Sequence, residues 1–381
     1  MQSAGKLSRL AALFLALWVP SLTFAQHYKQ TNLVSDVPTV PPTTTDVNLK
    51  NAWGLSRSTG SPWWVSDNGT GLSTLYNITG TTATLTATIN PRVVVIPPPN
   101  GSSSPSTPTG TVFNGSTDFA LAPDKPARFI FVTEDGTISG WNPAVDPNNA
   151  ILKVDNSPKA VYKGVTTGDV KGVRYLYVAN FRSGEIEVYD TNFMRVRFSD
   201  DTDGDHGAVF SEESFEDDEI PQGYAPFNVQ NIGGSLFVAY AKQDSAQHDD
   251  VAGEGFGFVD IFSTSGKLER RLEHGPWFNS PWGMVWTPRD FGEFSNRVLV
   301  GNFGSGQIAA FNGFTGKFIG LMKHSDDTTL TIDGLWALAF GNSANAGPYN
   351  ALFFTAGPNG EADGLLGALT AVGSEQDGDE E

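Results

Sequence analysis

The chain repeats one short pattern six times. In each copy an apolar strand ends in a small or polar residue, and in most copies a Gly turn and a second alternating strand follow. This order is typical of a β-hairpin. The six copies begin at residues 64, 131, 177, 237, 299 and 353.

The spacing of these hairpins indicates the fold. One polar or small position in each copy serves as a marker, and the markers lie 46 to 67 residues apart. A period near 40 to 60 residues, with about four strands in each unit, is typical of a β-propeller. We therefore expect an all-β, six-bladed propeller of NHL-like type. The markers are Asp67, Glu134, Asn180, Tyr240, Asn302 and Ala356.

A second element precedes most hairpins. It occupies residues 52–55, 225–229, 281–285 and 335–338, with weaker equivalents near residues 118–120 and 168–170. Its tryptophans, Trp53, Trp282 and Trp336, recur with the repeat. Because recurring aromatic residues fill the layers between blades, we expect these three to pack in the core rather than to stack on a sugar. Residues 26–50 are expected to supply the outer strand that closes the ring.

The two ends of the chain differ from the repeat. Lys6 and Arg9 precede a short apolar run at residues 11–19, and small residues follow up to Ala25. This pattern predicts a signal peptide over residues 1–25, cleaved near Ala25, and a secreted or periplasmic protein. No later apolar run is long enough for a transmembrane segment. The propeller domain is expected over residues 26–372, with a disordered acidic tail at residues 373–381.

The net charge of the chain restricts the kinds of partner that it is expected to bind. The formal net charge is −18, and removal of Lys6 and Arg9 brings it to about −20. Such a surface repels nucleic acid, so we expect a small ligand, a glycan or an extracellular protein as partner. The sequence has no cysteine. It also has no Walker loop or dinucleotide fingerprint, and neither a nucleotide nor a haem cofactor is expected.

Several motifs together resemble a known family. They occupy residues 51–55, 65–71, 224–229, 241–253, 280–283, 300–304, 332–336 and 354–358. The chain is similar, from Thr31 to Leu369, to a mostly uncharacterised family of exported bacterial proteins related to NHL-type β-propellers. The resemblance implies a propeller and export, but no reaction. An enlarged acidic insert at residues 200–205 departs from the family pattern, as does an end without the sorting-anchor signature of some relatives.

The first candidate site is a ring of repeat-equivalent residues around the axis. Oxygen atoms of Asp67, Glu134, Asn180 and Asn302, with the neighbouring Asn68, could bind a small ligand or a hard cation such as Ca²⁺. Gluconolactonase-like propellers, which hold a catalytic divalent metal with acidic and Asn ligands, resemble this outline. The alternative is that these side chains cap hairpin turns through hydrogen bonds to the backbone.

The second candidate is an acidic loop. Asp201, Asp203, Asp205 and Glu212 occupy positions one, three, five and twelve of an EF-hand-like calcium loop. However, His206 stands where the sharp-turn Gly is expected, and no amphipathic helix flanks the loop. A solvated acidic loop is the alternative.

The third candidate combines a histidine with carboxylates. His248, Asp249 and Asp250 could act as a general base with its orienting acids. Lys242 and Asp244 precede them and are candidate ligand-binding residues. Asp333 and Glu361 could join this cluster if the loops fold inward; the alternative is a set of surface ion pairs.

These candidate residues are compatible with two functions. The first is a ligand- or partner-binding module, stabilised by Ca²⁺ or another divalent cation if either metal site exists. The second is a metal-dependent hydrolase of lactonase or esterase type, with its site on the propeller axis. Because propellers support both kinds of function, the fold does not decide between them.

Overall fold

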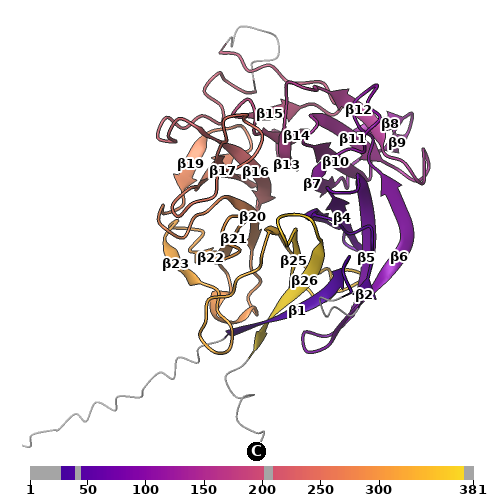
Figure 1. Ribbon diagram of the computed structural model, residues 1–381. Helices are drawn as coiled ribbons and strands as arrows, with labels where there is room; N and C mark the ends of the chain where they lie inside the picture. The colour runs from indigo at the N-terminus through magenta and orange to yellow at the C-terminus, as the bar shows by residue number, and fades with distance from the viewer. Residues whose placement is uncertain (1–26, 39–43, 201–208, 373–381) are drawn as a thin grey trace, which may run out of the picture.

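The protein is a six-bladed β-propeller. The computed structural model describes residues 27–38, 44–200 and 209–372. Six main sheets surround a common centre, and the innermost strand of each packs against the innermost strands of its two neighbours (Figure 1). The predicted fold class is therefore confirmed. Within the described residues, no helix has the length and hydropathy needed to cross a membrane.

The blades are numbered in chain order from the first complete sheet. Blade 1 contains β3 (Ala52–Ser56), β4 (Trp63–Asp67), β5 (Leu72–Gly80) and β6 (Leu85–Val95). Blade 2 contains β7 (Pro108–Phe113), β10 (Phe129–Thr133), β11 (Thr137–Trp141) and β12 (Ile151–Asp155), with the short pair β8 (Ala120–Ala122) and β9 (Lys125–Pro126) between its strands. Blade 3 contains β13 (Tyr162–Val170), β14 (Val173–Asn180) and β15 (Glu185–Tyr189).

The second half of the ring follows the same order. Blade 4 contains β16 (Tyr224–Ile232), β17 (Ser235–Lys242), β18 (Phe258–Ser263) and β19 (Leu268–Arg271). Blade 5 contains β20 (Pro281–Trp286), β21 (Val298–Asn302), β22 (Ile308–Phe311) and β23 (Phe318–Leu321), with the short helix η1 (Gly292–Phe294). Blade 6 contains β24 (Leu335–Phe340), β25 (Leu352–Ala356), β26 (Leu365–Val372), β1 (His27–Ser35) and β2 (Thr44–Thr45).

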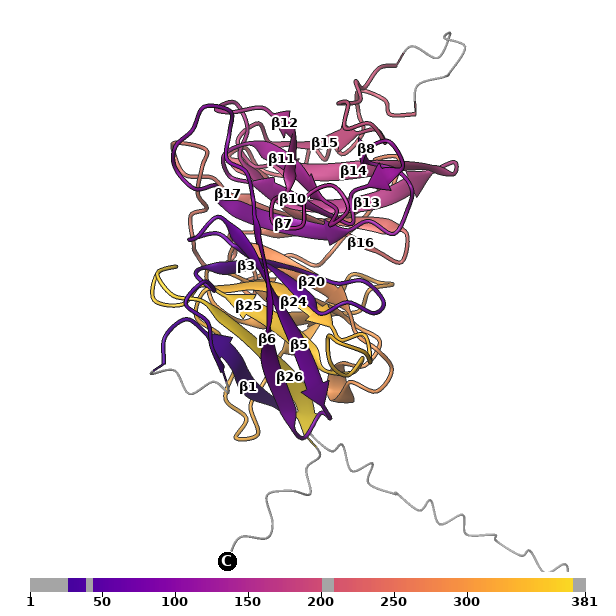
Figure 2. The same ribbon diagram turned by 90° about the vertical axis from the view of Figure 1, so that its right-hand side faces the viewer.

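The two ends of the chain close the ring in one sheet. Strand β1 pairs antiparallel with β26, so that His27 lies opposite Val372, and β2 pairs with β1 (Figure 2). Blade 6 therefore takes its inner strands from the end of the chain and its outer strands from the beginning. The predicted closure by residues 26–50 is confirmed.

Small residues allow the inner strands to approach one another closely. A Cβ atom added at Gly54 would overlap the carbonyl oxygen of Thr109 in the next blade. One at Gly110 would lie 2.8 Å from the backbone nitrogen of Val165. Because real Cβ atoms do not make such contacts, glycine is required where these strands face each other.

The residue before each of these small positions faces the axis region. Trp53, Trp282 and Trp336 are buried there and pack on one another, which confirms their predicted core role. The equivalents in blades 2 and 3 are Thr109 and Lys163, at the second positions of β7 and β13. The expected equivalents near residues 118–120 and 168–170 were wrong, because those residues lie at β8 and at the far end of β13.

Candidate functional site

Strand register shows which residues are equivalent around the ring. In five blades the first residue of the inner strand pairs with the last residue of the next strand. In blade 4 the corresponding pair is Pro226, the third residue of β16, with Tyr240 in β17. In blade 2 the last residue of the next strand is Thr133, opposite Pro108, so the marker assigned to Glu134 was displaced by one position. The true ring is Asp67, Thr133, Asn180, Tyr240, Asn302 and Ala356, all of which are buried.

Two members of this ring hold local turns. The Asn180 Oδ1 atom accepts hydrogen bonds from the backbone N–H groups of Val161, Arg182 and Ser183, at 3.2 to 3.3 Å. Asn302 accepts from the backbone of Asn279 at 2.9 Å and donates to the Gln307 carbonyl at 3.1 Å. These are the turn-capping roles that the sequence left as the alternative. Neither amide is directed to the cluster described below.

The next residue in each blade has the opposite orientation, because side chains alternate along a strand. At this position lie Asn68 and Glu134, and the aromatic residues Phe181 and Phe303. Asn68 Nδ2 donates a 2.8 Å hydrogen bond to Glu134 Oε2 across the boundary between blades 1 and 2. The polar contact between blades 1 and 2 is thus made one residue after the ring positions Asp67 and Thr133.

Lys163 lies at the centre of this arrangement. Its side chain is 2% exposed, and its Nζ atom forms an ion pair with Glu134 Oε1. Asp249 Oδ1 lies 3.5 Å from the same nitrogen. The ammonium also lies over the rings of Trp53, at 5.1 Å, and Phe181, at 5.8 Å. Charge pairing and cation–π contacts together compensate for the burial of this ammonium.

The polar contacts continue from Asn68 to blade 6. Asn51 Nδ2 donates to Asn68 Oδ1 at 3.3 Å and to Glu361 Oε2 at 3.1 Å. Asn51 Oδ1 accepts a 3.0 Å hydrogen bond from the buried indole N–H of Trp336. Asn51 has φ of +44°, a conformation that Asn tolerates better than most residues. One network therefore joins blades 6, 1, 2 and 3.

The fourth blade reaches the network through a loop between β17 and β18. His248 Nδ1 lies 2.8 Å from Asp249 Oδ1, and the His248 and Asp249 side chains are 40% and 67% exposed. The loop thus folds inward, as the third candidate required. We define the axial polar cluster by eight residues: Asn51, Asn68, Glu134, Lys163, His248, Asp249, Asp250 and Glu361.

Burial and neighbouring charges shift the pKa values of three carboxyl groups in this cluster. Burial and, after it, the charge of Glu134 raise the pKa of Glu361 to about 7, while Lys163 opposes the rise. Burial also raises the pKa of Asp250. For Asp249, burial acts upward, but the charges of Lys163 and His248 bring its pKa below the usual range. The cluster thus holds more carboxyl groups than its one buried ammonium neutralises.

Other predicted site residues lie outside the cluster. Asp244 Oδ1 accepts from the backbone of His248 at 2.9 Å and shapes the loop. Lys242 Nζ lies 4.1 Å from the centre of the Phe256 ring. Asp333 accepts from the backbone of Asn359 at 2.8 Å and does not join the cluster, whereas Glu361 does.

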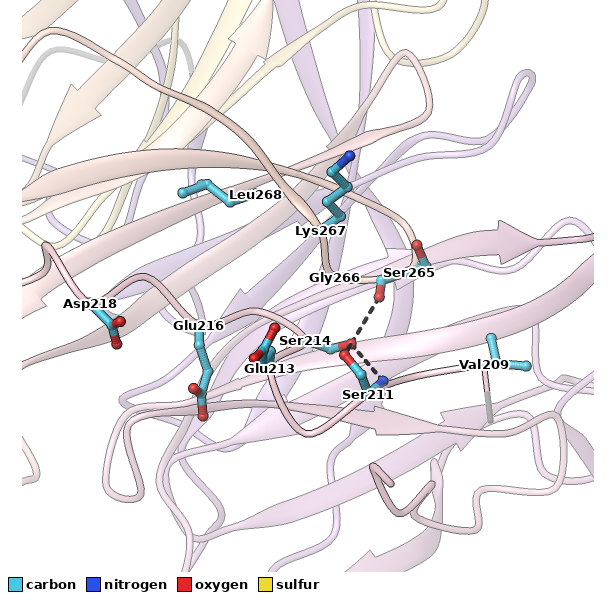
Figure 3. Close-up of a pocket in the computed structure, with 10 residues that line it drawn as sticks. All are labelled: Val209, Ser211, Glu213, Ser214, Glu216, Asp218, Ser265, Gly266, Lys267 and Leu268. Carbon is cyan, nitrogen blue, oxygen red and sulfur yellow. Dashed lines mark hydrogen bonds between the residues drawn. The ribbon is translucent and has the colours of Figure 1, made fainter. Parts of the chain in front are cut away.

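The predicted acidic metal loop is only partly described. Asp201, Asp203 and Asp205 lie outside the described residues, and Glu212 is exposed, with its backbone bonded to Asp200. A groove of about 650 Å³ follows this segment (Figure 3). There Ser214 accepts from the Ser211 backbone and donates to the Ser265 carbonyl, both at 3.0 Å. The groove is lined by exposed acidic side chains and Lys267, and it is separate from the axial polar cluster.

Aromatic packing closes the axis beneath the cluster. The Trp336 ring stacks on two others: its centroid lies 3.6 Å from that of Trp53 and 3.9 Å from that of Phe303. On the far side of this layer the inner strands enclose a cavity of only about 50 Å³, beside Gly110 and Gly283. This cavity is too small for a ligand of more than a few atoms.

Sequence comparison relates the chain to viral proteins. It is 31% identical over 333 residues to uncharacterized protein R648 of Acanthamoeba polyphaga mimivirus, with 85% of this chain and 76% of that protein covered. Uncharacterized protein L690 of the same virus is 30% identical, with 85% and 81% covered. The chain belongs to the family of these proteins. No protein-family model matches it. These relatives are viral, whereas the sequence resemblance indicated exported bacterial proteins.

Structural comparison agrees with the fold. A structural genomics protein of unknown function from Bacteroides thetaiotaomicron VPI-5482 superposes with a TM-score of 0.51 over 91% of this chain and 76% of that chain. The two sequences are 8% identical, so the likeness shows the propeller fold alone. The family members and this neighbour carry no described activity, and the function has to be inferred from the site.

Proposed function

We propose that the protein is a ligand-binding propeller that acts outside the cytoplasm and holds a small organic cation at the axial polar cluster. The observation that carries this proposal is the hydrogen-bonded network from Glu361 through Asn51, Asn68 and Glu134 to Lys163. It brings together side chains that are up to 310 residues apart in the sequence. Convergent polar groups on a rigid scaffold are typical of ligand sites.

The charge of the cluster favours a positively charged ligand. Glu134, Asp249, Asp250 and Glu361 lie around one buried ammonium. Burial, with repulsion between the carboxylates, raises the pKa of Glu361 to about 7 and that of Asp250 above its usual range. An added cation would relieve that repulsion. Phe303, partly exposed beside Trp336, offers an aromatic face of the kind that attracts alkylammonium groups.

Calorimetric titration of the mature protein tests this proposal, with putrescine and choline as cationic probes and glucose as the neutral comparison. Binding of a cationic probe is expected for the wild type and is expected to weaken at least tenfold in Asp249→Asn and Glu361→Gln. Glu254→Gln, an exposed change outside the cluster, should leave it unaltered. Equal binding of glucose, or binding unaffected by both cluster variants, would contradict the proposal.

A metal-dependent hydrolase is the second candidate, and one observation favours it. Donor atoms of Glu134, His248 and Asp249 lie within 4.8 Å of one another, a spacing that one divalent ion could bridge. Imidazole with two carboxylates suits Zn²⁺ or Mn²⁺, which would polarise a carbonyl group and activate water. A divalent ion would have to take Glu134 and Asp249 from the Lys163 ammonium, which already lies beside both, and for this reason we rank binding first.

The hydrolase candidate has its own test. Lactone and aryl-ester hydrolysis would be measured with Zn²⁺ or Mn²⁺ added, for the wild type and for His248→Ala. Metal-dependent turnover that disappears in His248→Ala would favour the hydrolase over the binding module. Turnover that is equal in both proteins would exclude this site as its source.

A further inference from the structure

A fully buried carboxyl group lies away from the axis, at the joint between blades 6 and 1. Asp67, at the end of β4, is 0% exposed. Neither of its carboxyl oxygen atoms has a hydrogen-bond partner among the described residues. Burial raises the pKa of Asp67 well above its usual range, and Thr74 lies close enough to oppose the rise, although its hydroxyl oxygen makes no hydrogen bond of normal geometry in the described structure. A buried carboxyl group in such a place either keeps its proton or, when ionised, requires a compensating positive charge.

A second carboxyl group faces the same space. Asp46, 6% exposed, accepts a 3.0 Å hydrogen bond from the Tyr76 hydroxyl through Oδ2 and another from the Asn48 backbone through Oδ1. Its charge raises the pKa of Asp67, and both carboxyl groups raise that of Tyr76. Among the described residues, no Lys, Arg or His forms an ion pair with Asp46 or Asp67.

We propose that Asp46 and Asp67, with the hydroxyl groups of Thr74 and Tyr76, form a buried structural site for Ca²⁺. Two carboxylates balance the charge of one divalent ion. The donors are all oxygen atoms, which is the donor set that Ca²⁺ prefers. Mg²⁺ fits less well, because it keeps several water molecules and this site is enclosed.

The position of the site gives the ion a structural role. Asp46 belongs to the segment that leads from the closing strands β1 and β2 to blade 1, whereas Asp67, Thr74 and Tyr76 belong to β4 and β5. The surrounding core combines Phe353 and Leu366 of blade 6 with Trp63 and Val65 of blade 1. An ion between Asp46 and Asp67 would therefore fix the closing segment to the first blade.

This inference is independent of the axial ligand, and metal analysis of the whole mature protein tests it. After gel filtration in metal-free buffer, elemental analysis should find about one calcium ion per chain, because an enclosed ion exchanges slowly. Unfolding and refolding with a chelator should yield a protein with a lower melting temperature, which added Ca²⁺ restores. Asp67→Asn should contain no calcium and should show no such response.

A matched control separates this site from the axis. Glu134→Gln removes a carboxylate from the axial polar cluster and should keep the calcium. The proposal is overturned if the wild type holds no calcium and melts at the same temperature with and without it. It is also overturned if Asp67→Asn melts at a higher temperature than the wild type. That result would mean that Asp67 is protonated in the folded protein and binds no ion. If Asp67→Asn does not fold, the calcium content and melting response of the wild type still decide.

Discussion

Lys163 and Glu134 form an ion pair at the axis in which the two side chains are only 2% and 10% exposed. Lys163 occupies the position that Trp53, Trp282 and Trp336 occupy in other blades, and its stem and ammonium lie among the rings of that aromatic layer. A charged residue thus replaces one member of a hydrophobic ring. Glu134 from the neighbouring blade makes that replacement tolerable.

Lys163→Met should destabilise the fold strongly. The substitution leaves Glu134 without its partner in a mostly buried position, and breaking a buried pair in this way costs about 3–5 kcal/mol. Urea denaturation measures the loss. The double variant Lys163→Met with Glu134→Gln should recover part of it, because no unpaired charge remains. A single variant within about 1 kcal/mol of the wild type would contradict the importance of the pair.

Gly54→Ala should also destabilise the ring, because its new methyl group would overlap the Thr109 carbonyl oxygen of the next blade. Overpacking of this kind costs about 1–3 kcal/mol or more. Gly60→Ala is the matched control, since nothing lies within 4 Å of a Cβ atom at that position. Thermal melting compares the two; equal melting temperatures would mean that the inner strands separate without penalty.

Asn51→Ala tests the junction between blades 6 and 1. It removes the acceptor of the buried Trp336 indole N–H and the donor to Asn68 and Glu361. A loss of about 2–3 kcal/mol is expected in chemical denaturation. Asn359→Ala serves as control, because Asn359 shares the positive φ, at +59°, but is exposed. If both variants lose the same amount, backbone conformation alone explains the effect.

Glu361 should make stability depend on pH. Its pKa is about 7 in the folded protein and near 4.5 in the unfolded chain, so the folded state binds more protons between these values. Stability should therefore fall as pH rises from about 4.5 to 7, by about 1–2 kcal/mol after allowance for solvent screening. Denaturation at pH 5 and pH 8 measures this slope. Glu361→Gln should flatten it, and the exposed Glu254→Gln should not.

The fold could be predicted from the sequence because its signal is repeated. The same local pattern recurs along the chain: there are six hairpins, most with a Gly turn, and tryptophans return with the same period in several blades. The closing strand was predictable for the same reason, since a last blade with three strands needs an outer one. Even so, blade 2 was read one residue out of register, because Glu134 resembles Asp67 more closely than Thr133 does.

The candidate site was less predictable, because its residues come from six strand ends and loops of unrelated sequence. Lys163 was missed, although Lys163-Gly164 stands at the repeat position of Trp53-Gly54 and an alignment of the inner strands would have shown it. The inward fold of His248 and Asp249 depends on tertiary contacts with Lys163. Asp67 was predicted as one of the ligands around the axis, but its side chain is buried at the joint that holds Asp46 and Tyr76.

Strand β26, the last of the described chain, lies between β25 and β1 in blade 6. Strand β1 is synthesised first among the described strands, but it gains its antiparallel neighbour only when β26 has been made. The ring therefore cannot close before residues 365–372 have been synthesised, whatever the state of the other five blades.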